Sequence, residues 1–166
     1  MVKFKGSEVA LNAASIKAGD TAPEITLVNN SLQTVQVGGS KNKAQLILAV
    51  PSLDTGVCAT QSKVFNEKVS ALDVEGFIVS MDLPFASGRF CQSESISKLQ
   101  AVSDFRNKAF SKEYGLLMQD SPLEGLCARA VFVVDKGGKV VYSEVVEEVT
   151  TEPNYDKALE ALTSVL

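Results

Sequence analysis

Residues 46–58 read Leu46-Ile47-Leu48-Ala49-Val50-Pro51-Ser52-Leu53-Asp54-Thr55-Gly56-Val57-Cys58. The first five residues form an unbroken apolar run, typical of a strand buried on both faces. Pro51 ends this run, because proline has no N–H to donate to a sheet. Asp54 or Thr55 is suited to cap a helix. The residues that then share one helical face are Cys58, Ser62, Phe65, Val69 and Leu72. The stretch predicts a buried strand, a loop, and a helix with a cysteine in its first turn.

The remaining chain alternates short apolar runs with helical patterns. Strands are predicted at 77–81, 130–134 and 139–146, the last after a turn at 135–138, with shorter ones at 25–27 and 34–37. A small N-terminal hairpin is predicted from 3–6 and 9–11, within about residues 1–12. Helices are predicted at 93–102, at 105–114 and at the C-terminus, where Tyr155, Leu159, Leu162 and Leu166 share a face.

This order of elements is strand, helix, strand, helix, a closing hairpin and a final helix. It is the order of a thioredoxin-like α/β fold, in which two right-handed crossovers feed a central mixed β-sheet flanked by helices. The 166 residues suit a single domain spanning 1–166. We therefore expect one thioredoxin-like domain preceded by an N-terminal β-hairpin.

Composition narrows the possible functions. The net charge of −4 argues against nucleic acid as a partner, since phosphate binding needs a concentrated positive surface. No segment approaches the roughly 18 to 20 apolar residues that cross a bilayer. The first residues also lack the apolar run of a signal peptide. The expectation is a cytoplasmic protein without a membrane partner.

The chain contains no histidine. Nucleophile–histidine pairs and histidine-based zinc or haem sites are therefore excluded. The three cysteines cannot complete a four-thiolate metal site alone, and no glycine-rich phosphate loop is present. No metal or organic cofactor is predicted, and cysteine is the nucleophile whose surroundings are most informative.

Cys58 is predicted to lie in the first turn of a helix, where free N–H groups and the helix dipole favour an anionic thiolate. In thioredoxins this junction carries a Cys-x-x-Cys pair, but Thr55 replaces the first cysteine here. The hydroxyl of Thr55 cannot form a disulfide, although it can hydrogen-bond a thiolate or a peroxide oxygen. The alternative is that Cys58 is an inert core residue, the common fate of a free cysteine.

Pro51, Thr55 and Cys58 match the Pro-x-x-x-Thr-x-x-Cys pattern of peroxiredoxins. With the extended string 51–58, the sequence resembles the bacterial thiol peroxidase branch, an atypical two-cysteine subfamily. The other matching segments are 82–86, 89–91, 105–107, 125–126, 128–130 and 150–153. The resemblance covers nearly the whole chain, and the combination of motifs is far more specific than the first pattern alone.

The resemblance implies roles for individual residues. Cys58 would be the peroxidatic cysteine, which attacks the peroxide O–O bond and becomes a sulfenic acid. Thr55 would hydrogen-bond the thiolate and the peroxide, and Pro51 would shield the site from water. Arg129 would stabilise the thiolate and the developing charge. Without the resemblance, Arg129 would be interpreted as an ordinary surface ion pair.

Cys91 would be the resolving cysteine, condensing with oxidised Cys58 into an intramolecular disulfide that thioredoxin re-reduces. If Cys58 is packed away from Cys91, both segments must unwind before the sulfur atoms can meet. Cys127 departs from the family pattern and is either a buried core thiol or an alternative resolving or regulatory thiol.

An apolar pocket is expected around Leu53, Phe85, Ala86 and Phe90, which suggests alkyl hydroperoxides as substrates alongside hydrogen peroxide. The same side chains would equally suit a core or a dimer interface. Members of this branch form homodimers, so a homodimer is expected by resemblance. Two other functions stay open on the residues alone: a thiol-disulfide oxidoreductase acting on proteins, and a non-enzymatic redox sensor or chaperone-like binder.

Overall fold

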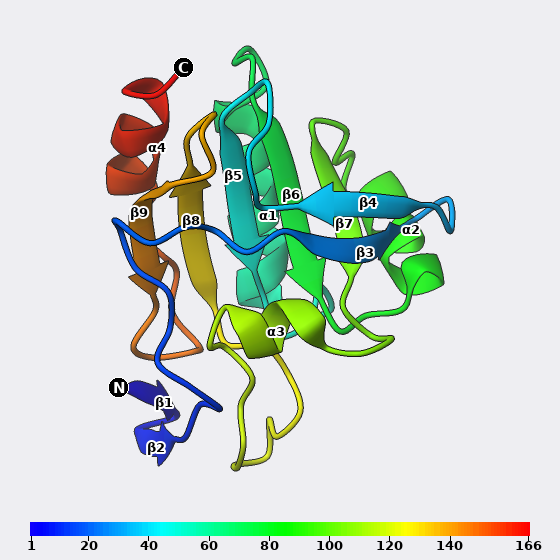
Figure 1. The fold of residues 1–166 in the computed structure, drawn as a ribbon. Helices are drawn as coiled ribbons and strands as arrows, with labels where there is room; N and C mark the ends of the chain where they lie inside the picture. The colour runs from blue at the N-terminus through cyan, green and yellow to red at the C-terminus, as the bar shows by residue number, and fades with distance from the viewer.

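Seven strands form one mixed sheet in the order β4-β3-β7-β6-β5-β8-β9 in the computed structural model, which describes residues 1–166 (Figure 1). The strands are β1 Val2–Phe4, β2 Ser7–Val9, β3 Ile25–Asn29, β4 Thr34–Val37, β5 Gln45–Ala49, β6 Glu75–Ser80, β7 Leu99–Ser103, β8 Ala130–Val134 and β9 Val140–Val145. The helices are α1 Gly56–Lys68, α2 Pro84–Ser93, α3 Ala109–Glu113 and α4 Tyr155–Thr163. The mixed sheet, the flanking helices and the N-terminal hairpin predicted from the sequence are confirmed.

β5 is an interior strand of the sheet, which pairs in parallel with β6 and antiparallel with β8. β6 pairs in parallel with β7 on its other side. Every residue of β5 and of β8 is buried, as expected for strands covered on both faces. The carboxyl ends of β5, β6 and β7 therefore meet at one edge of the sheet, and the loops that follow them are neighbours.

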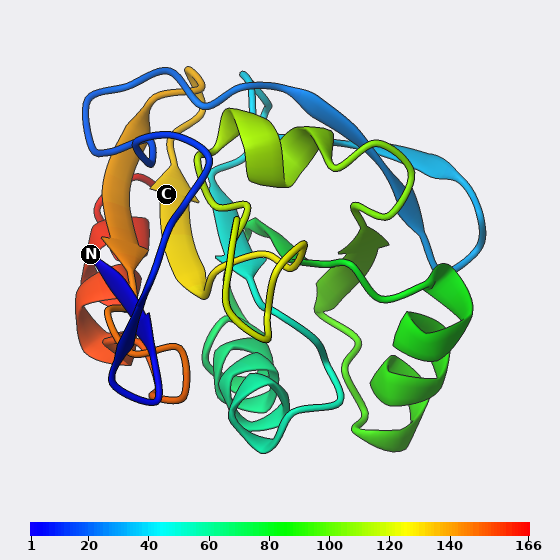
Figure 2. The same ribbon diagram turned by 90° about the horizontal axis from the view of Figure 1, so that it is seen from below.

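Alternating residues of the central strands pack into two separate cores. Ile47 and Ala49 of β5 point into one core, whereas Leu46 and Leu48 point into the other. Helices α1, α2 and α4 cover the Leu46 face through Phe65, Phe90 and Leu162, respectively. Helix α3 covers the opposite face, and Figure 2 shows the sheet between these two layers.

The helix predicted at 93–102 is wrong. Helix α2 begins at Pro84, whose fixed φ suits the first helical position, and it ends at Ser93. Ser95 then adopts a positive φ of 55°, which no continuing helix allows. Residues Leu99–Ser103 form β7, because parallel pairing with β6 satisfies their backbone and buries their apolar side chains. Because this short strand mixes polar and apolar residues, the sequence alone does not distinguish it from an irregular helix.

The predicted helix at 105–114 is shorter in the structure. The chain reaches α3 through Lys108 in the left-handed conformation, so only Ala109–Glu113 is helical. The buried carboxylate of Asp104 accepts hydrogen bonds from the N–H groups of Phe110 and Ser111 (3.0 and 2.9 Å). Burial raises the pKa of Asp104, against the opposing effect of these hydrogen bonds.

The N-terminal hairpin is tied to the segment that follows β9. The Glu148 carboxylate accepts hydrogen bonds from the N–H groups of Lys5 and Gly6 (2.9 and 3.0 Å), which hold the pKa of Glu148 at about 2. The Val149 N–H donates to the Lys3 carbonyl (2.9 Å). The hairpin thereby orders the backbone around Val149, whose carbonyl supports a buried arginine described below.

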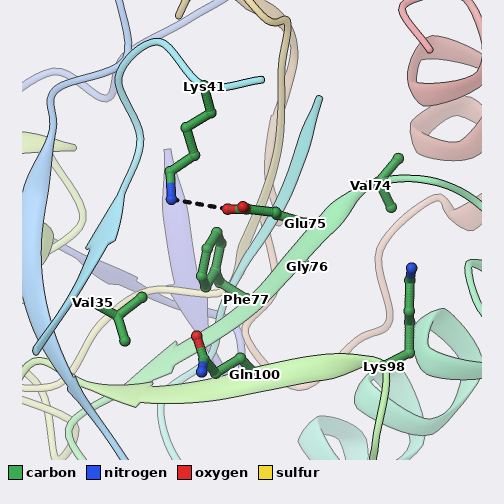
Figure 3. A pocket seen from close by; sticks show the side chains of 8 residues that line it. All are labelled: Val35, Lys41, Val74, Glu75, Gly76, Phe77, Lys98 and Gln100. Carbon is green, nitrogen blue, oxygen red and sulfur yellow. Dashed lines mark hydrogen bonds and ion pairs between the residues drawn. The ribbon is translucent and has the colours of Figure 1, made fainter. Parts of the chain in front are cut away.

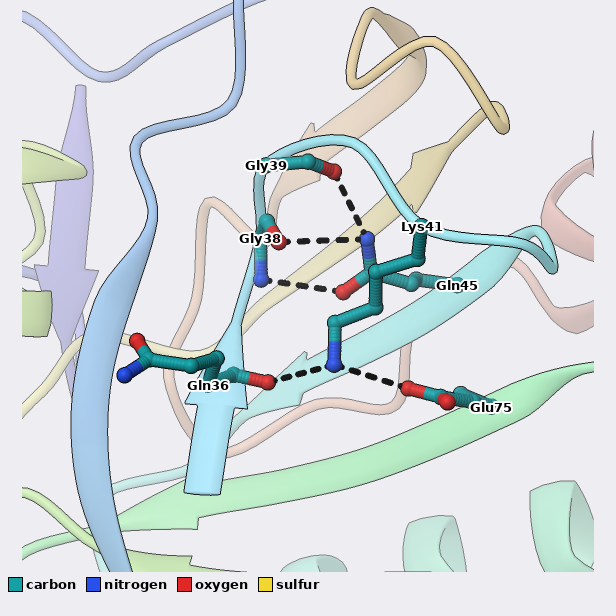
Figure 4. A network of polar contacts seen from close by, with 6 residues as sticks. All are labelled: Gln36, Gly38, Gly39, Lys41, Gln45 and Glu75. Atoms are coloured by element: carbon teal, nitrogen blue, oxygen red, sulfur yellow. Dashed lines mark hydrogen bonds and ion pairs between the residues drawn. The ribbon is translucent and has the colours of Figure 1, made fainter. Parts of the chain in front are cut away.

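A buried glutamine connects β4 to β5. Gln45 accepts a hydrogen bond from the Gly38 N–H (2.9 Å) and donates to the carbonyls of Gly38 and Gly39 (3.3 and 3.0 Å), as Figure 4 shows. Gly38 has a φ of +82°, and a side chain there would collide with the Pro23 carbonyl and the Tyr114 hydroxyl. This turn lies at the amino end of β5, at the opposite end of the strand from Cys58.

Candidate active site

Cys58 is the third residue of α1 and has no solvent-exposed surface. It follows the carboxyl end of β5, the edge where open α/β sheets place their ligands. Pro51 and Leu53 of the intervening loop are buried, whereas Thr55 and Gly56 are exposed. Exposed residues therefore lie within three positions of Cys58 in the chain, at the start of α1.

Thr55 is the N-cap of α1, one of the two candidates, Asp54 or Thr55, that the sequence predicts. Its hydroxyl oxygen accepts a hydrogen bond from the Cys58 N–H and its hydroxyl donates to the Ser52 carbonyl, both at 3.3 Å. These contacts are at the long end of the range for hydrogen bonds. The hydroxyl could therefore exchange either partner for a ligand oxygen at small energetic cost.

Arg129 is 2% exposed and interacts with neutral groups only. Its Nε donates to the Val149 carbonyl and its Nη1 donates to Oε1 of Gln61, both at 2.9 Å. Gln61 lies one helical turn after Cys58 on α1. A buried guanidinium without a carboxylate partner favours any anion that forms nearby. The surface ion pair considered as the alternative is wrong for this residue.

Cys91 lies near the end of α2 and is 9% exposed. Burial raises the pKa of its thiol, against opposing hydrogen bonds from the Asn30 side chain and the Ala101 backbone. It borders a polar pocket of about 420 Å³. The lining residues are Asn29, Asn30, Ser31, Cys91, Ile96, Ser97, Lys98, Leu99, Gln100 and Ala101.

Cys58 and Cys91 are free thiols that belong to the same hydrophobic core, under α1 and α2. Cys127 is also a free thiol, but it belongs to the core on the opposite face of the sheet. Complete burial raises the pKa of the Cys127 thiol to about 12. These surroundings favour the interpretation of Cys127 as a core thiol over that of an alternative resolving thiol.

Only three buried side-chain polar atoms lack a hydrogen-bond partner, and all three lie on the two cysteine helices. They are Nε2 of Gln61 and the hydroxyls of Ser62 and Ser87. Ser62 lies one turn after Cys58, and Ser87 lies one turn before Cys91. Because a buried unpartnered polar group costs about 1–3 kcal/mol, both helices carry a penalty next to their cysteine that unwinding would relieve.

The apolar pocket expected around Leu53, Phe85, Ala86 and Phe90 is not assembled as one cavity. Leu53 and Phe90 are buried in the core that contains Cys58, whereas Phe85 is 71% exposed. Phe85 points outward because it lies in the first turn of α2, on the face away from the sheet. It contributes to the molecular surface near the site rather than to its interior.

A second pocket of about 330 Å³ lies at the amino end of β6, far along the strand from the Cys58 loop (Figure 3). Lys41 Nζ lies 2.9 Å from a Glu75 oxygen and 5.0 Å from the centroid of the Phe77 ring. Its third partner is the Gln36 carbonyl at 2.6 Å. Because these charges already satisfy one another, this pocket is not a candidate site for chemistry.

Sequence reasoning missed two residues of the site, Gln61 and Asp82. The sequence contains one indication of the role of Gln61. A glutamine on a helical face that packs against a sheet needs a buried hydrogen-bond partner. Asp82 belongs to the 82–86 segment, but its position there indicates no particular partner. In the structure, its carboxylate accepts hydrogen bonds from the loop that leads to Cys58.

No group of three or more potential ligand side chains is arranged to hold a metal ion. No helix combines the length and the apolar character needed to cross a membrane.

Comparison with known proteins finds similarity over nearly the whole chain. The Redoxin family pattern matches residues 17–159, a range that includes Cys58, Cys91 and Arg129. The chain is 48% identical over 159 residues to the thiol peroxidase of Aquifex aeolicus, covering 95% of this chain and 94% of that protein. It is 48% identical over 158 residues to the thiol peroxidase of Campylobacter jejuni, covering 95% of this chain and 89% of that protein.

Among solved structures, the crystal structure of a peroxiredoxin-like protein from Aquifex aeolicus matches with a TM-score of 0.96 and 45% identity. The match covers 99% of this chain and 96% of that chain. The arrangement of strands and helices is therefore the thioredoxin-like fold expected from the sequence.

The buried contact between Gln61 and Arg129 predicts a loss of stability in Gln61→Ala. The substitution leaves a buried guanidinium N–H unpartnered, so the free energy of unfolding should fall by about 1.5–3 kcal/mol. Glu67→Ala, at an exposed position of the same helix, is the matched control. Urea denaturation measures both variants, and equal stabilities would show that the contact contributes nothing.

Proposed function

This chain belongs to the thiol peroxidase family of the peroxiredoxins, and on that premise we propose that Cys58 is the residue that reduces the peroxide. The protein is a thiol peroxidase, and a peroxide is its substrate. The observation that carries the proposal is the environment of Cys58. It is a buried thiol in the first turn of α1, and a guanidinium without a carboxylate partner is bound to the next turn.

In the first step, the Cys58 thiolate attacks the terminal oxygen of a hydroperoxide. The S–O bond forms as the O–O bond breaks, and the departing alkoxide or hydroxide takes a proton to become an alcohol or water. Cys58 is thereby oxidised to a sulfenic acid. Arg129 stabilises the negative charge on the sulfur and the leaving oxygen, while Thr55 supplies a hydroxyl to the peroxide. Pro51, a buried residue of the loop, keeps water away from the thiolate.

In the second step, the Cys91 sulfur attacks the sulfur of the Cys58 sulfenic acid. A disulfide forms between the two residues and water leaves. An external dithiol protein then reduces this disulfide, and we assign that role to thioredoxin. Hydrogen peroxide and alkyl hydroperoxides both fit this chemistry, since only the terminal oxygen reacts.

The second step requires movement of α1 and α2, because both cysteines are buried within the packed core. The unpartnered hydroxyls of Ser62 and Ser87 support this motion. Each hydroxyl regains hydration when its helix unwinds, which lowers the free energy of the unwound state relative to the packed state.

We also propose that the enzyme acts as a homodimer that buries the exposed apolar side chains beside the active site. Leu83 and Phe85 follow the carboxyl end of β6, and Phe105 follows that of β7. They are 45%, 71% and 58% exposed, respectively. Large apolar side chains gathered at one edge are typical of an interaction surface.

The peroxidase mechanism predicts distinct defects for the three cysteines. With thioredoxin, thioredoxin reductase and NADPH, the wild type should consume hydroperoxide, and Cys58→Ser should show no activity. In Cys91→Ser, peroxide should oxidise Cys58 once, but thioredoxin should not support further turnover. Cys127→Ala should retain turnover, because its thiol lies on the other face of the sheet. NADPH oxidation measures all four proteins, and activity in Cys58→Ser would refute the mechanism.

The unwinding step predicts that Ser62→Ala and Ser87→Ala slow the formation of the Cys58–Cys91 disulfide. Alanine removes the desolvation penalty from the packed state, so the unwound population should fall about threefold to tenfold. Oxidation of Cys58 by peroxide should be unchanged. Rapid-quench mass spectrometry separates the two rates.

Thr60→Ala and Ser93→Ala are the controls for this experiment. They lie on the same two helices, but their hydroxyls donate to the carbonyls of Gly56 and Phe90 (3.0 and 3.1 Å). Because these variants also introduce alanine into α1 and α2, they measure how far the higher helix propensity of alanine alone changes the rate of disulfide formation. If the controls slow disulfide formation as much as the test variants do, the unpartnered hydroxyls are not responsible.

The dimer proposal predicts that the double substitution Phe85→Glu and Phe105→Glu yields monomers, because two charges would lie in the apolar contact. Leu166→Glu, at a large exposed side chain elsewhere (48% exposed), should leave the dimer intact. Sedimentation equilibrium measures the mass in solution. A monomeric wild type, or a dimeric double variant, would contradict the proposed surface.

A further inference from the structure

Asp82 lies just beyond the end of β6 and contacts the loop that precedes the Cys58 helix. Its Oδ2 accepts hydrogen bonds from the Leu53 N–H (2.7 Å) and the Ser80 hydroxyl (2.9 Å). Its Oδ1 accepts one from the Ser52 hydroxyl (2.9 Å). Hydrogen bonds to an ionised carboxylate are shorter and stronger than those between neutral groups. One side chain therefore joins the Cys58 loop to the rigid edge of the sheet.

No other polar group provides this connection. The remaining hydrogen bonds made by residues 51–57 stay within the loop or run into α1 itself. Without the Asp82 carboxylate, the loop would be held by the packing of Pro51 and Leu53 and, at its base, by the hydrogen bond from the Val50 N–H to the Val79 carbonyl (3.0 Å). The position of Thr55 and of the first turn of α1 thus depends on Asp82.

An ordinary structural role for Asp82 would be to cap α2, since aspartate near a helix start commonly accepts from free N–H groups. The structure assigns the N-cap of α2 to Leu83, and no side chain hydrogen-bonds the first turn of that helix. The hydrogen bonds that the Asp82 carboxylate accepts come instead from the Cys58 loop and Ser80. These hydrogen bonds indicate that the Asp82 carboxylate stabilises the loop before Cys58 rather than the start of α2.

Asp82 also lies between the two helices that must unwind. It precedes Pro84, the first residue of α2, and α2 carries Cys91 near its end. Its own backbone is held at β6, where the Asp82 N–H donates to the Ser80 hydroxyl (3.2 Å). When α1 and α2 unwind, the loop can leave this anchor and later return to it.

We propose that Asp82 is a positioning residue that holds the Cys58 loop in the conformation that reacts with peroxide. The proposal rests on the proposed function of Cys58. While the loop is hydrogen-bonded to Asp82, Cys58 and Thr55 are arranged for attack on the O–O bond. Release of the loop from Asp82 belongs to the unwound state, in which Cys58 can meet Cys91. Loss of the carboxylate should therefore slow the oxidation of Cys58 without slowing disulfide formation.

The test compares Asp82→Ala with wild type in the full-length, pre-reduced protein. The second-order rate of Cys58 oxidation by hydrogen peroxide should fall about tenfold to a hundredfold, the range for small misplacements of a reacting group. The first-order rate of disulfide formation should stay equal or rise. Rapid-quench mass spectrometry follows both steps, and thermal unfolding of the same samples reports global stability.

Asp82→Asn is the conservative variant, since an amide keeps one oxygen for the Leu53 N–H and can donate to the Ser52 hydroxyl. It should restore at least half of the lost oxidation rate. Ser52→Ala removes only the hydrogen bond to Oδ1 and should give a smaller decrease than Asp82→Ala; it decides the question if Asp82→Ala does not fold. Asp54→Asn is the control, because Asp54 is exposed and its carboxylate accepts none of these hydrogen bonds.

The two proposals fail in different ways. If peroxide oxidises a residue other than Cys58 in the wild type, the proposed function is wrong regardless of Asp82. If Cys58 reacts in the wild type and reacts equally fast in Asp82→Ala, only the positioning role is wrong. An equal decrease of both rates in Asp82→Ala would also overturn it, because the effect would then be general.

Discussion

The parallel pairing of β5 with β6 determines which loops lie beside Cys58 in this protein. Ala49 lies opposite Val79, so both strands end at the same edge of the sheet. The loop after β5 leads to Cys58, and the turn after β6 supplies the carboxylate of Asp82 that binds that loop. β7 extends the same edge and ends near Phe105. The Cys58 loop, the Asp82 carboxylate and the exposed apolar surface lie at one edge because three strands run in the same direction.

The proposed active site combines a tightly packed thiol with local features that oppose the packing. Cys58 has no exposed surface, and the nearby guanidinium of Arg129 is bound by neutral groups only. A packed, partly dry environment strengthens the effect of that positive charge on a developing anion. Yet Ser62 and Ser87 leave hydroxyls unpartnered on the two cysteine helices. The two helices that carry Cys58 and Cys91 would therefore regain hydration of these hydroxyls by unwinding.

Much of the fold could be predicted from the sequence, and the misses have physical causes. The apolar run 46–50 and the segment 130–134 predicted the central strands well, because full burial leaves an unmistakable pattern. β7 was missed because Leu99–Ser103 mixes polar and apolar residues, and its conformation depends on pairing with β6. The helix predicted at 105–114 begins only at Ala109, because Lys108 adopts the left-handed conformation and the Asp104 carboxylate binds the N–H groups of Phe110 and Ser111.

By itself, the sequence determined that a cysteine follows a buried strand in the first turn of a helix, since caps, proline and periodicity act over a few residues. It also carried the family motif. Only the tertiary structure decided that Gln61 meets Arg129, that Asp82 binds the Cys58 loop, and that Cys127 faces the other core. These contacts join residues far apart in the chain. Their geometry depends on how the sheet is assembled, which no local pattern specifies.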